Sequence, residues 1–278
     1  MTRRQFIKSA LSLAVLNGLY AWKIEPYRVQ YRFVDMPIKK LPKKLMGKTI
    51  MQISDLHIGE RMANDFFLKT FKTAQKYQPD FVIYTGDYVN YKSKKQLAEL
   101  EKVMQHTVKG KLGTIAVLGN HDYGQDWDNA QIAKQITQVL QNAGITVLRN
   151  ETIQIENLNF IGIDDVKGTN FYPKKAFQHY NSKQANIVLC HNPDVCDMNV
   201  WQNYKGWILS GHTHGGQVKI PFFSPPILPV KNKKYSSGKI DLKDGRILYI
   251  NRGLGTSIIP FRFNVRPEIT VFKLIGET

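Results

Sequence analysis

The segment GWILSGHTHGG, residues 206–216, joins a short apolar run to two histidines that stand one residue apart among glycines. Histidine is scarce here, seven in 278 residues, so a pair at this spacing indicates a functional site. The run is rich in Ile, Leu and Trp without polar alternation, which is typical of a strand covered on both faces. Glycine at 211, 215 and 216 permits tight turns. The segment predicts a buried strand that presents two imidazoles at its carboxyl end.

Four other apolar runs end in the same way. They are KTIMQIS before Asp55-Leu56-His57, DFVIYTG before Asp87, TIAVLG before Asn120-His121-Asp122, and ANIVLC before His191. Amphipathic stretches between several of these runs predict helices, at about 65–77, 94–107 and 128–143. Residues 27–34 alternate like a strand, and 145–164 and 217–274 are typical of meandering strands. Strands alternating with helices predict an α/β fold, in which active sites lie at the carboxyl ends of the strands.

The formal charge of +17 is strongly basic and predicts an anionic partner or surface. Residues 1–48 hold eleven Lys and Arg against two acids, with the densest run at 38–48, IKKLPKKLMGK. This run is either a solvated arm or a patch on an anionic membrane or envelope polymer, where each basic residue contributes about 1 kcal/mol. We therefore expect a basic arm over 26–48, followed by one domain over 49–278.

The first residues, MTRRQFIK, resemble a twin-arginine export signal, and an apolar run follows at 9–22. As a helix this run reaches about 21 Å, short of the roughly 30 Å hydrocarbon core of a bilayer. We expect residues 1–25 to direct export to the periplasm or the outer face of the inner membrane. The run at 9–22 is either removed with the signal or retained as an anchor.

Cysteine and the remaining histidines carry no expected chemistry. Two cysteines, Cys190 and Cys196, do not form a disulfide framework, and we expect Cys190 to pack in the core. His106 and His179 lie outside the strand-end clusters and are expected at the surface.

Seven side chains at the strand ends have the chemistry of metal ligands: Asp55, His57, Asp87, Asn120, His191, His212 and His214. In an extended chain, residues i and i+2 share a face, so Asp55 and His57 would point to one side, as would His212 and His214. If Asp87 bridges, each of two ions receives four protein ligands. Imidazole with carboxylate suits Mn, Fe or Zn, and disfavours Ca or Mg. Two such ions sharing a hydroxide would activate an in-line displacement at phosphorus.

The motifs DLH (55–57), GDY (86–88), GNHD (119–122), His191 and GHTH (211–214) resemble the signature of the calcineurin-like metallophosphoesterases, in order and spacing. The resemblance covers about residue 49 to the C-terminus and implies a single-domain, four-layer α/β/β/α sandwich. It implies that one ion is held by Asp55, His57, Asp87 and His214. It implies that the other is held by Asp87, Asn120, His191 and His212.

The resemblance also implies roles for two residues that are not ligands. His121 would be the general acid that protonates the leaving oxygen. Asp122 would orient His121 or support the neighbouring turn.

The tail, with PVKNKKYSSG at 229–238 and the segment 251–274, resembles a bacterial branch of envelope-directed phosphodiesterases. That branch includes a UDP-2,3-diacylglucosamine pyrophosphatase of lipid A synthesis. Arg252 is a candidate for binding substrate phosphate, with Arg262 and Arg266 as weaker candidates, because a guanidinium binds phosphate in a bidentate fork. The alternative for each is a structural ion pair or a bond to a carbonyl.

Three functions remain open on this evidence. We favour a dinuclear-metal-dependent phosphodiesterase at the cell envelope, acting on a small-molecule or lipid phosphodiester or pyrophosphate. The alternative is the lipid A pyrophosphatase, and a third is a non-catalytic envelope-binding protein. Nucleic acid is not expected as a partner, because the basic residues concentrate ahead of the motifs and no aromatic-basic stacking motif is present. We expect a monomer.

Overall fold

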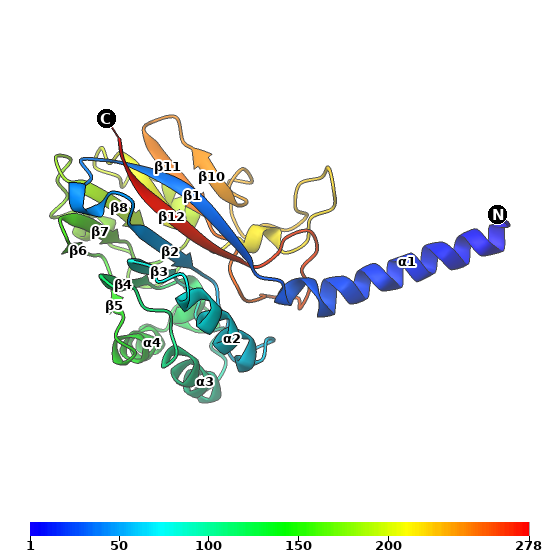
Figure 1. Cartoon of the computed structure of the whole chain (residues 1–278). Coiled ribbons are helices and arrows are strands. Elements are labelled where there is room, and N and C mark those ends of the chain that lie inside the picture. Colours follow the sequence, from blue (N-terminus) through cyan, green and yellow to red (C-terminus); the bar gives the residue numbers. More distant parts are fainter. Residues whose placement is uncertain (278) are drawn as a thin grey trace.

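The computed structural model describes residues 1–277 and contains two six-stranded sheets (Figure 1). The first sheet has the order β1 (Gln30–Lys39), β12 (Glu268–Glu277), β2 (Thr49–Ile53), β3 (Phe81–Thr85), β4 (Gly113–Val117) and β5 (Thr146–Val147). The second has the order β10 (Gly238–Asp241), β11 (Arg246–Ile250), β9 (Gly206–Ser210), β8 (Ala185–Leu189), β7 (Leu158–Gly162) and β6 (Glu151–Ile155).

Alternate residues of the central strands face two different cores, which explains why these strands are apolar throughout. Ile50 and Phe81 belong to the core between the two sheets, where the Phe81 ring lies 5.2 Å from that of Phe160 on β7. Their neighbours Met51 and Val82 face the opposite way, toward the helices. The sequence is therefore uniformly apolar in these strands because both of their faces are covered.

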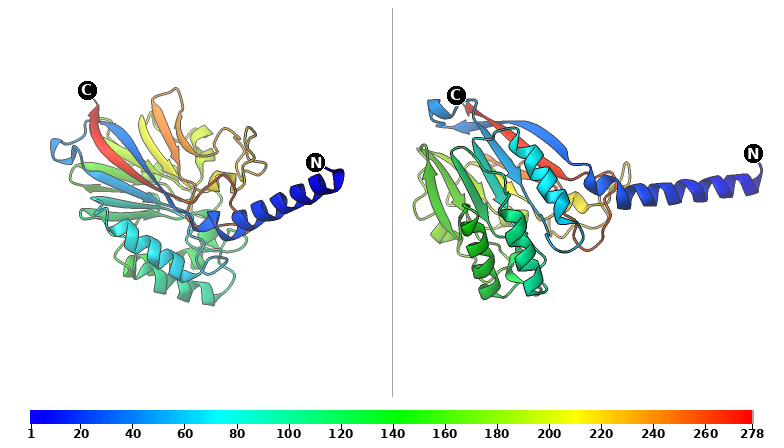
Figure 2. Two further views of the ribbon diagram at one scale, coloured as in Figure 1. Left: turned by 45° about the vertical axis from the view of Figure 1, so that its right-hand side comes forward. Right: turned by 60° about the horizontal axis from the view of Figure 1, so that its bottom comes forward.

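Three amphipathic helices cover the outer face of the first sheet: α2 (Asn64–Gln75), α3 (Lys94–Met104) and α4 (Ala130–Asn142) (Figure 2). The outer face of the second sheet is covered by the short α5 (Pro173–Ala176), the turn η4 (Pro193–Asp197) and loops. There the rings of Phe177, Trp201 and Tyr204 pack on one another. The predicted four-layer, single-domain α/β sandwich is confirmed, with loops making up most of its fourth layer.

The predicted basic arm over 26–48 is wrong, because this segment is part of the domain. β1 pairs with β12 in parallel register along ten residues, and Met36, Ile38 and Leu45 are buried in the core between the sheets. The short turn η2 (Lys43–Leu45) carries its two lysines on the exposed side. The lysines at 39, 40, 43 and 44 are exposed at and after the end of this edge strand, whereas its residues Met36 and Ile38 face inward.

Helix α1 (Arg3–Lys23) extends away from the body and then joins η1 (Glu25–Tyr27) (Figures 1 and 2). The main-chain N–H of Arg262 donates to the carbonyl of Ala21 at 3.0 Å, and the buried carboxylate of Glu25 accepts from Val265 N–H at 2.7 Å. These bonds fix the base of α1 to the domain. Among residues 1–277, no helix combines the length and the apolar character needed to span a bilayer.

The two cysteines and two histidines for which the sequence predicted no chemistry lie in the core and at the surface, respectively. Cys190 and Cys196 are buried and free, with the Cys190 thiol 3.4 Å from the carbonyl of Asn192. His106 and His179 are exposed.

Candidate metal centre

Five acidic and histidine side chains meet at the carboxyl ends of the strands. The main chain at each of these residues is left-handed. Their φ angles lie between 49° and 72°, for Asp55, His57, Asp87, His212 and His214. An extended chain, expected from the i and i+2 spacing, is therefore not what brings these side chains together. Non-glycine residues with positive φ are uncommon and concentrate at functional sites, where the surrounding fold holds them in place.

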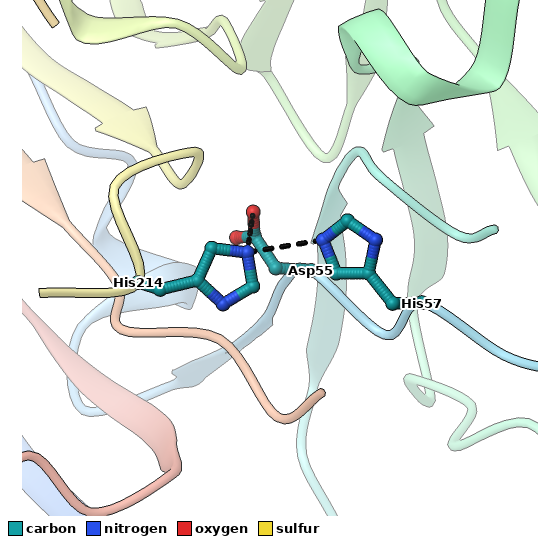
Figure 3. Close-up of side chains that lie close together, drawn as sticks. All are labelled: Asp55, His57 and His214. Atoms are coloured by element: carbon teal, nitrogen blue, oxygen red, sulfur yellow. Dashed lines mark hydrogen bonds and ion pairs between the residues drawn. The ribbon is translucent and has the colours of Figure 1, made fainter. Parts of the chain in front are cut away.

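The first cluster consists of Asp55, His57 and His214, all buried, with candidate ligand atoms within 4.8 Å of one another (Figure 3). The Nε2 atoms of the two histidines lie 3.0 Å apart, and His214 Nε2 is 3.4 Å from Asp55 Oδ1. Asp55 also accepts the main-chain N–H of His212 at 3.0 Å. The two imidazoles and the carboxylate thus converge on one point.

The second cluster consists of Asp87, His191 and His212, also buried and within 4.8 Å. His191 Nε2 lies 3.1 Å from Asp87 Oδ2 and 3.2 Å from His212 Nδ1. Asp87 Oδ2 is in addition 3.8 Å from Nε2 of His57, a member of the first cluster. One carboxylate oxygen therefore lies between the two clusters.

The outer ring nitrogens of the second cluster are bonded to main-chain carbonyls. His191 Nδ1 donates to Thr85 O at 2.6 Å, and His212 Nε2 donates to Pro229 O at 3.1 Å. Such bonds place the proton on the outer nitrogen and direct the lone pair of the other nitrogen inward. In the first cluster, His57 Nδ1 has no hydrogen-bond partner among residues 1–277, and His214 Nδ1 faces the Arg262 guanidinium at 3.5 Å.

The side-chain amide of Asn120 tests whether the site fits metal ions. Asn120 is fully buried at the start of η3 (Asn120–Tyr123), and neither its oxygen nor its nitrogen has a hydrogen-bond partner among the described residues. Buried polar groups are ordinarily paired, so an orphaned amide beside facing imidazoles points to an absent ligand. Imidazole, carboxylate and amide donors suit Mn, Fe or Zn. The two clusters fit a dinuclear metal centre.

Charges within the clusters shift the pKa values of their members in opposite directions. Burial raises the pKa of Asp55 to about 7 and lowers that of His57 to about 4. Burial alone would lower the pKa of His191, but the carboxylates of Asp87, Asp55 and Asp165 together outweigh it and raise that pKa to about 10. Burial alone would raise the pKa of Asp87, but His191, His121 and His57 together hold it well below the usual range. Without ions, the second cluster forms a charged pair.

Asp122 supports the turn that holds Asp87. Its carboxylate accepts the main-chain N–H groups of Asp87 and Tyr88, both at 2.9 Å, and of Gly119 at 2.8 Å. Of the two roles expected for Asp122, support of the neighbouring turn is the one that these bonds provide.

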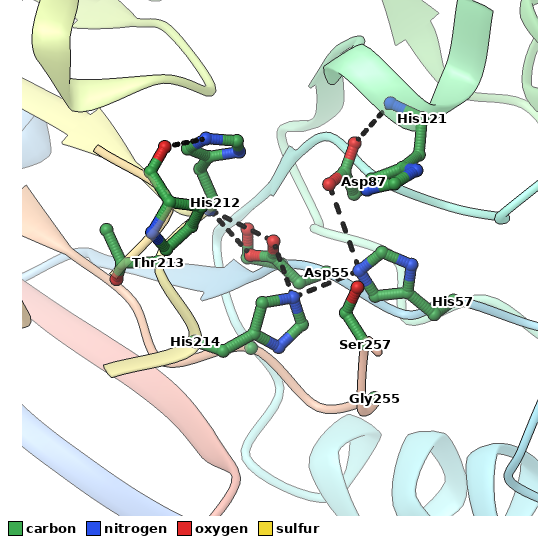
Figure 4. Close-up of polar contacts among 12 residues, drawn as sticks. Asp55, His57, Asp87, His121, His212, Thr213, His214, Gly255 and Ser257 are labelled. Carbon is green, nitrogen blue, oxygen red and sulfur yellow. Dashed lines mark hydrogen bonds and ion pairs between the residues drawn. The ribbon is translucent and has the colours of Figure 1, made fainter. Parts of the chain in front are cut away.

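His121 follows directly on Asn120, and its main-chain N–H donates to Asp87 Oδ1 at 2.9 Å (Figure 4). Its ring packs edge-on against two others, with centroids 5.2 Å from His57 and 5.6 Å from Trp127. His121 is not a member of either three-residue cluster. Its ring lies beside the metal centre and faces the adjoining cavity.

A cavity of about 220 Å³ opens over both clusters. It is lined by Asp87, Asn120, His121, Trp127, Lys167, His212, Thr213, His214, Gly216, Gln217, Ile227, Pro229, Ser257 and Ile258. The sequence interpretation missed Lys167, whose Nζ lies 3.3 Å from His212 Nε2 and 4.7 Å from the Trp127 ring centroid. Lys167 follows β7, so the polar segment after that strand was the signal that could have revealed it.

Comparison of this sequence with known protein families identifies the family of the chain. Residues 48–216 match the family described as calcineurin-like phosphoesterase. The chain belongs to the calcineurin-like phosphoesterases. As a member, it is a metal-dependent phosphoester hydrolase, and the non-catalytic alternative is wrong.

Several relatives of this phosphoesterase match over almost their whole length. An uncharacterized metallophosphoesterase of Bacillus subtilis, YkuE, is 28% identical, covering 99% of this chain and 98% of that one. The phosphodiesterase YaeI of Escherichia coli is 28% identical, covering 99% and 100%. The UDP-2,3-diacylglucosamine pyrophosphatase LpxG of Chlamydia trachomatis is 27% identical, covering 98% and 97%.

The three candidate arginines of this calcineurin-like phosphoesterase are engaged by its fold. Arg252 donates to Glu268 at 2.5 Å and to Gln30 at 2.7 Å, the kind of structural contact that was the alternative to binding substrate phosphate. Arg262 is fully buried, and its guanidinium donates to four main-chain carbonyls, including that of Arg252. Arg266 donates to a main-chain carbonyl of the segment before β1. The structural alternative applies to all three arginines.

Proposed function

We propose that this chain hydrolyses a phosphodiester or pyrophosphate bond at a dinuclear centre of Mn, Fe or Zn. One ion would be held by Asp55, His57, Asp87 and His214, and the other by Asp87, Asn120, His191 and His212. The observation that carries the proposal is Asp87 Oδ2, which lies 3.1 Å from His191 Nε2 and 3.8 Å from His57 Nε2. A carboxylate in that place can serve both ions.

The two ions, when bound, polarise the phosphoryl group and lower the pKa of the attacking water. The protein holds the ligand side chains in place before substrate arrives. His191 and His212 are oriented by the carbonyls of Thr85 and Pro229. Asp87 donates its main-chain N–H to the Asp122 carboxylate and accepts the main-chain N–H of His121 at Oδ1. Ligands fixed in this way need no rearrangement during the reaction.

His121 is proposed as the general acid that protonates the leaving oxygen. Its ring lines the cavity beside Asp87 and contacts the ring of His57, so it can reach a phosphoester bound between the clusters. Burial lowers the pKa of His121, and the negative charge of a bound phosphate would oppose that shift. The bond from His121 N–H to Asp87 Oδ1 ties the position of the acid to that of the shared carboxylate.

Lys167 is proposed to bind a phosphate oxygen of the substrate. Its ammonium group lies at the cavity beside His212, and no carboxylate forms a salt bridge with it in the described residues. A cation there would attract the anionic substrate and offset its charge as the bond breaks.

A pyrophosphate substrate is the second candidate, and the whole-length similarity to LpxG favours it. The cavity supports a substrate with an apolar part, because Trp127, Ile227 and Ile258 line it next to the metal ligands. The same centre can activate attack on a phosphodiester or a pyrophosphate, so substrate preference must come from this lining.

We further propose that the enzyme is a monomer that follows the twin-arginine route to the periplasm or the outer face of the inner membrane. Support comes from Arg3 and Arg4, which are exposed in the first turn of α1, well away from the domain (Figure 1). Export of an already folded enzyme suits a metal centre assembled from seven positions spread over the chain.

The test is hydrolysis by the full chain of an aryl phosphodiester and of a UDP-linked diacyl sugar, after chelation and re-addition of Mn, Fe or Zn. The full chain is required because Glu25 pairs with Val265 inside the domain. Metal-dependent turnover of the aryl diester supports the proposal, and strong preference for the UDP-lipid supports the second candidate. Asp87→Asn run in parallel detects contaminating phosphatase. Absence of turnover on both substrates with two ions bound contradicts both candidates.

A further inference from the structure

Exposed apolar side chains gather at the mouth of the cavity. They are Ile220, Phe222, Phe223, Ile227, Ile258, Ile259 and Phe261, here called the mouth patch. Phe222 is fully exposed and Phe223 is 67% exposed. Exposed apolar side chains grouped on neighbouring loops mark a site of contact with a partner or a membrane.

The two loops of the mouth patch are bonded into one unit. Val218 bridges to Phe263, and the Gln217 side-chain amide exchanges hydrogen bonds with the main chain of Ser257. Two members of the mouth patch, Ile227 and Ile258, also line the cavity. The patch and the entrance to the metal centre are therefore one continuous surface.

Helix α1 leaves the body at the same place. The rings of Trp22 and Phe261 lie 6.4 Å apart, and Arg262 N–H donates to the carbonyl of Ala21. Figure 1 shows the loops around 220 (yellow) and 260 (orange-red) at the end of the body from which α1 extends. The exposed apolar side chains of α1, among them Leu11 and Leu16, thus begin beside the mouth patch.

The segments that carry the mouth patch and α1 contain basic residues and no acidic ones. Segments 1–24, 218–234 and 257–266 contain no Asp or Glu. Their exposed basic side chains are Arg3, Arg4, Lys8, Lys23, Lys219, Lys231, Lys233 and Lys234. Apolar tips flanked by cations without acids complement an anionic bilayer, where the tips enter the interface and the cations meet the headgroups.

We propose that the mouth patch docks on an anionic lipid bilayer, so that a membrane amphiphile carrying the phosphoester enters the metal centre from the bilayer. Ile227 and Ile258 would contact the apolar part of the substrate while its phosphoester reaches the clusters. Docking of the mouth patch on a bilayer does not depend on the proposed function, but the route of the substrate rests on the proposed phosphoester hydrolysis.

Insertion is tested with a single labelled cysteine in the full chain. Cys190 and Cys196 are buried, so Phe222→Cys can carry an environment-sensitive fluorophore at that position alone. Phe33→Cys is the matched control, because Phe33 is 66% exposed on β1, outside the mouth patch. With phosphatidylcholine vesicles containing phosphatidylglycerol, we expect a blue shift at position 222 and none at 33. An unchanged spectrum at 222, with or without vesicle binding through α1, overturns the proposal and leaves the mouth patch to a protein partner.

The substrate route is tested with the double variant Phe222→Ser/Phe223→Ser beside Phe33→Ser. We expect the double variant to lose at least about tenfold in hydrolysis of a vesicle-embedded phosphodiester and to retain turnover of a soluble aryl diester. An equal loss on both substrates, or no loss on either, contradicts the route. A wild type inactive on both diesters contradicts the proposed function, and the fluorescence result still decides docking.

Discussion

The two clusters of the metal centre are built from similar side chains but are held differently. In the second, His191 and His212 are bonded through their outer nitrogens to main-chain carbonyls. In the first, His57 has no such bond, and His214 faces a buried guanidinium. The main chain alone orients the second cluster, whereas the first depends more on the ion it holds. The types of ligand identify a metal site, but the hydrogen-bond partners of the outer ring nitrogens decide how well the ligands are oriented without metal.

Asp87 is the residue whose loss should have the largest effect, because its carboxylate oxygen lies between the clusters. We expect Asp87→Asn to lower kcat by at least about a thousandfold and to reduce bound metal below two ions per chain. Activity assays with elemental analysis measure both. The exposed Asp241→Asn serves as control. Two retained ions with full activity would show that the two clusters do not depend on a shared Asp87 carboxylate.

His121→Ala should have the next largest effect, and it separates metal binding from proton transfer. Because His121 contacts the ring of His57 without belonging to either cluster, both ions should remain. We expect kcat to fall by about a hundredfold or more, as for loss of a general acid. His106→Ala, at an exposed histidine, should change nothing. A loss of one ion from His121→Ala would instead make His121 a ligand.

The pH dependence of metal binding should differ between the clusters. The neighbouring carboxylates raise the pKa of His191 to about 10, so at neutral pH His191 carries a proton that an ion must displace. Affinity at the second cluster should therefore rise by up to about tenfold per pH unit between about pH 8 and 10. His57 is already neutral and Asp55 ionised there, so the first cluster should change little. Calorimetric titrations at several pH values measure the two slopes, and equal slopes would contradict this difference.

Removal of the ions should also affect ring motion unequally. After chelation, we expect the imidazole NMR signals of His191 and His212 to stay sharp, because their carbonyl partners remain. Those of His57 and His214 should broaden. Equal broadening of all four would show that the carbonyl bonds do not orient the second cluster.

Arg252→Ala should have the smallest effect on activity, since its guanidinium is bonded to Glu268 and Gln30 outside both clusters. We expect KM to stay within about twofold, while the free energy of unfolding falls by about 1–3 kcal/mol because buried Glu268 loses one of its hydrogen-bond donors. Denaturant titration and steady-state kinetics distinguish the two outcomes. A large rise in KM would restore Arg252 as a substrate contact.

Apolar runs and the polar residues that follow them are local patterns, so the sequence predicted the α/β fold and the convergence of the strand ends, and the resemblance to a known family implied the four-layer sandwich. It did not predict the left-handed main chain at Asp55 and His57, since positive φ in these residues is imposed by the surrounding fold. The sequence also did not predict that Arg252 is bonded to Glu268 and Gln30. Glu268 and Gln30 lie 16 and 222 positions away, so only the packed structure could choose between an ion pair and a phosphate contact.

β1 was misjudged for a related reason. The lysines of the run 38–48 indicated a solvated arm, but the partner strand of β1, β12, lies more than 200 residues away, and that pairing buries Met36 and Ile38. A basic edge strand and a basic arm have similar composition. The alternation over 27–34 was the better signal.

The position of β12 between β1 and β2 has a consequence for synthesis on the ribosome. Translation produces β1 early, yet its only neighbour in the sheet emerges after every other described strand. Until then, β1 has no strand to pair with, and Glu25 lacks Val265. The nascent protein therefore cannot close its first sheet until β12 has emerged. A message truncated before β12 would yield a chain whose N-terminal segment stays open to chaperones and proteases.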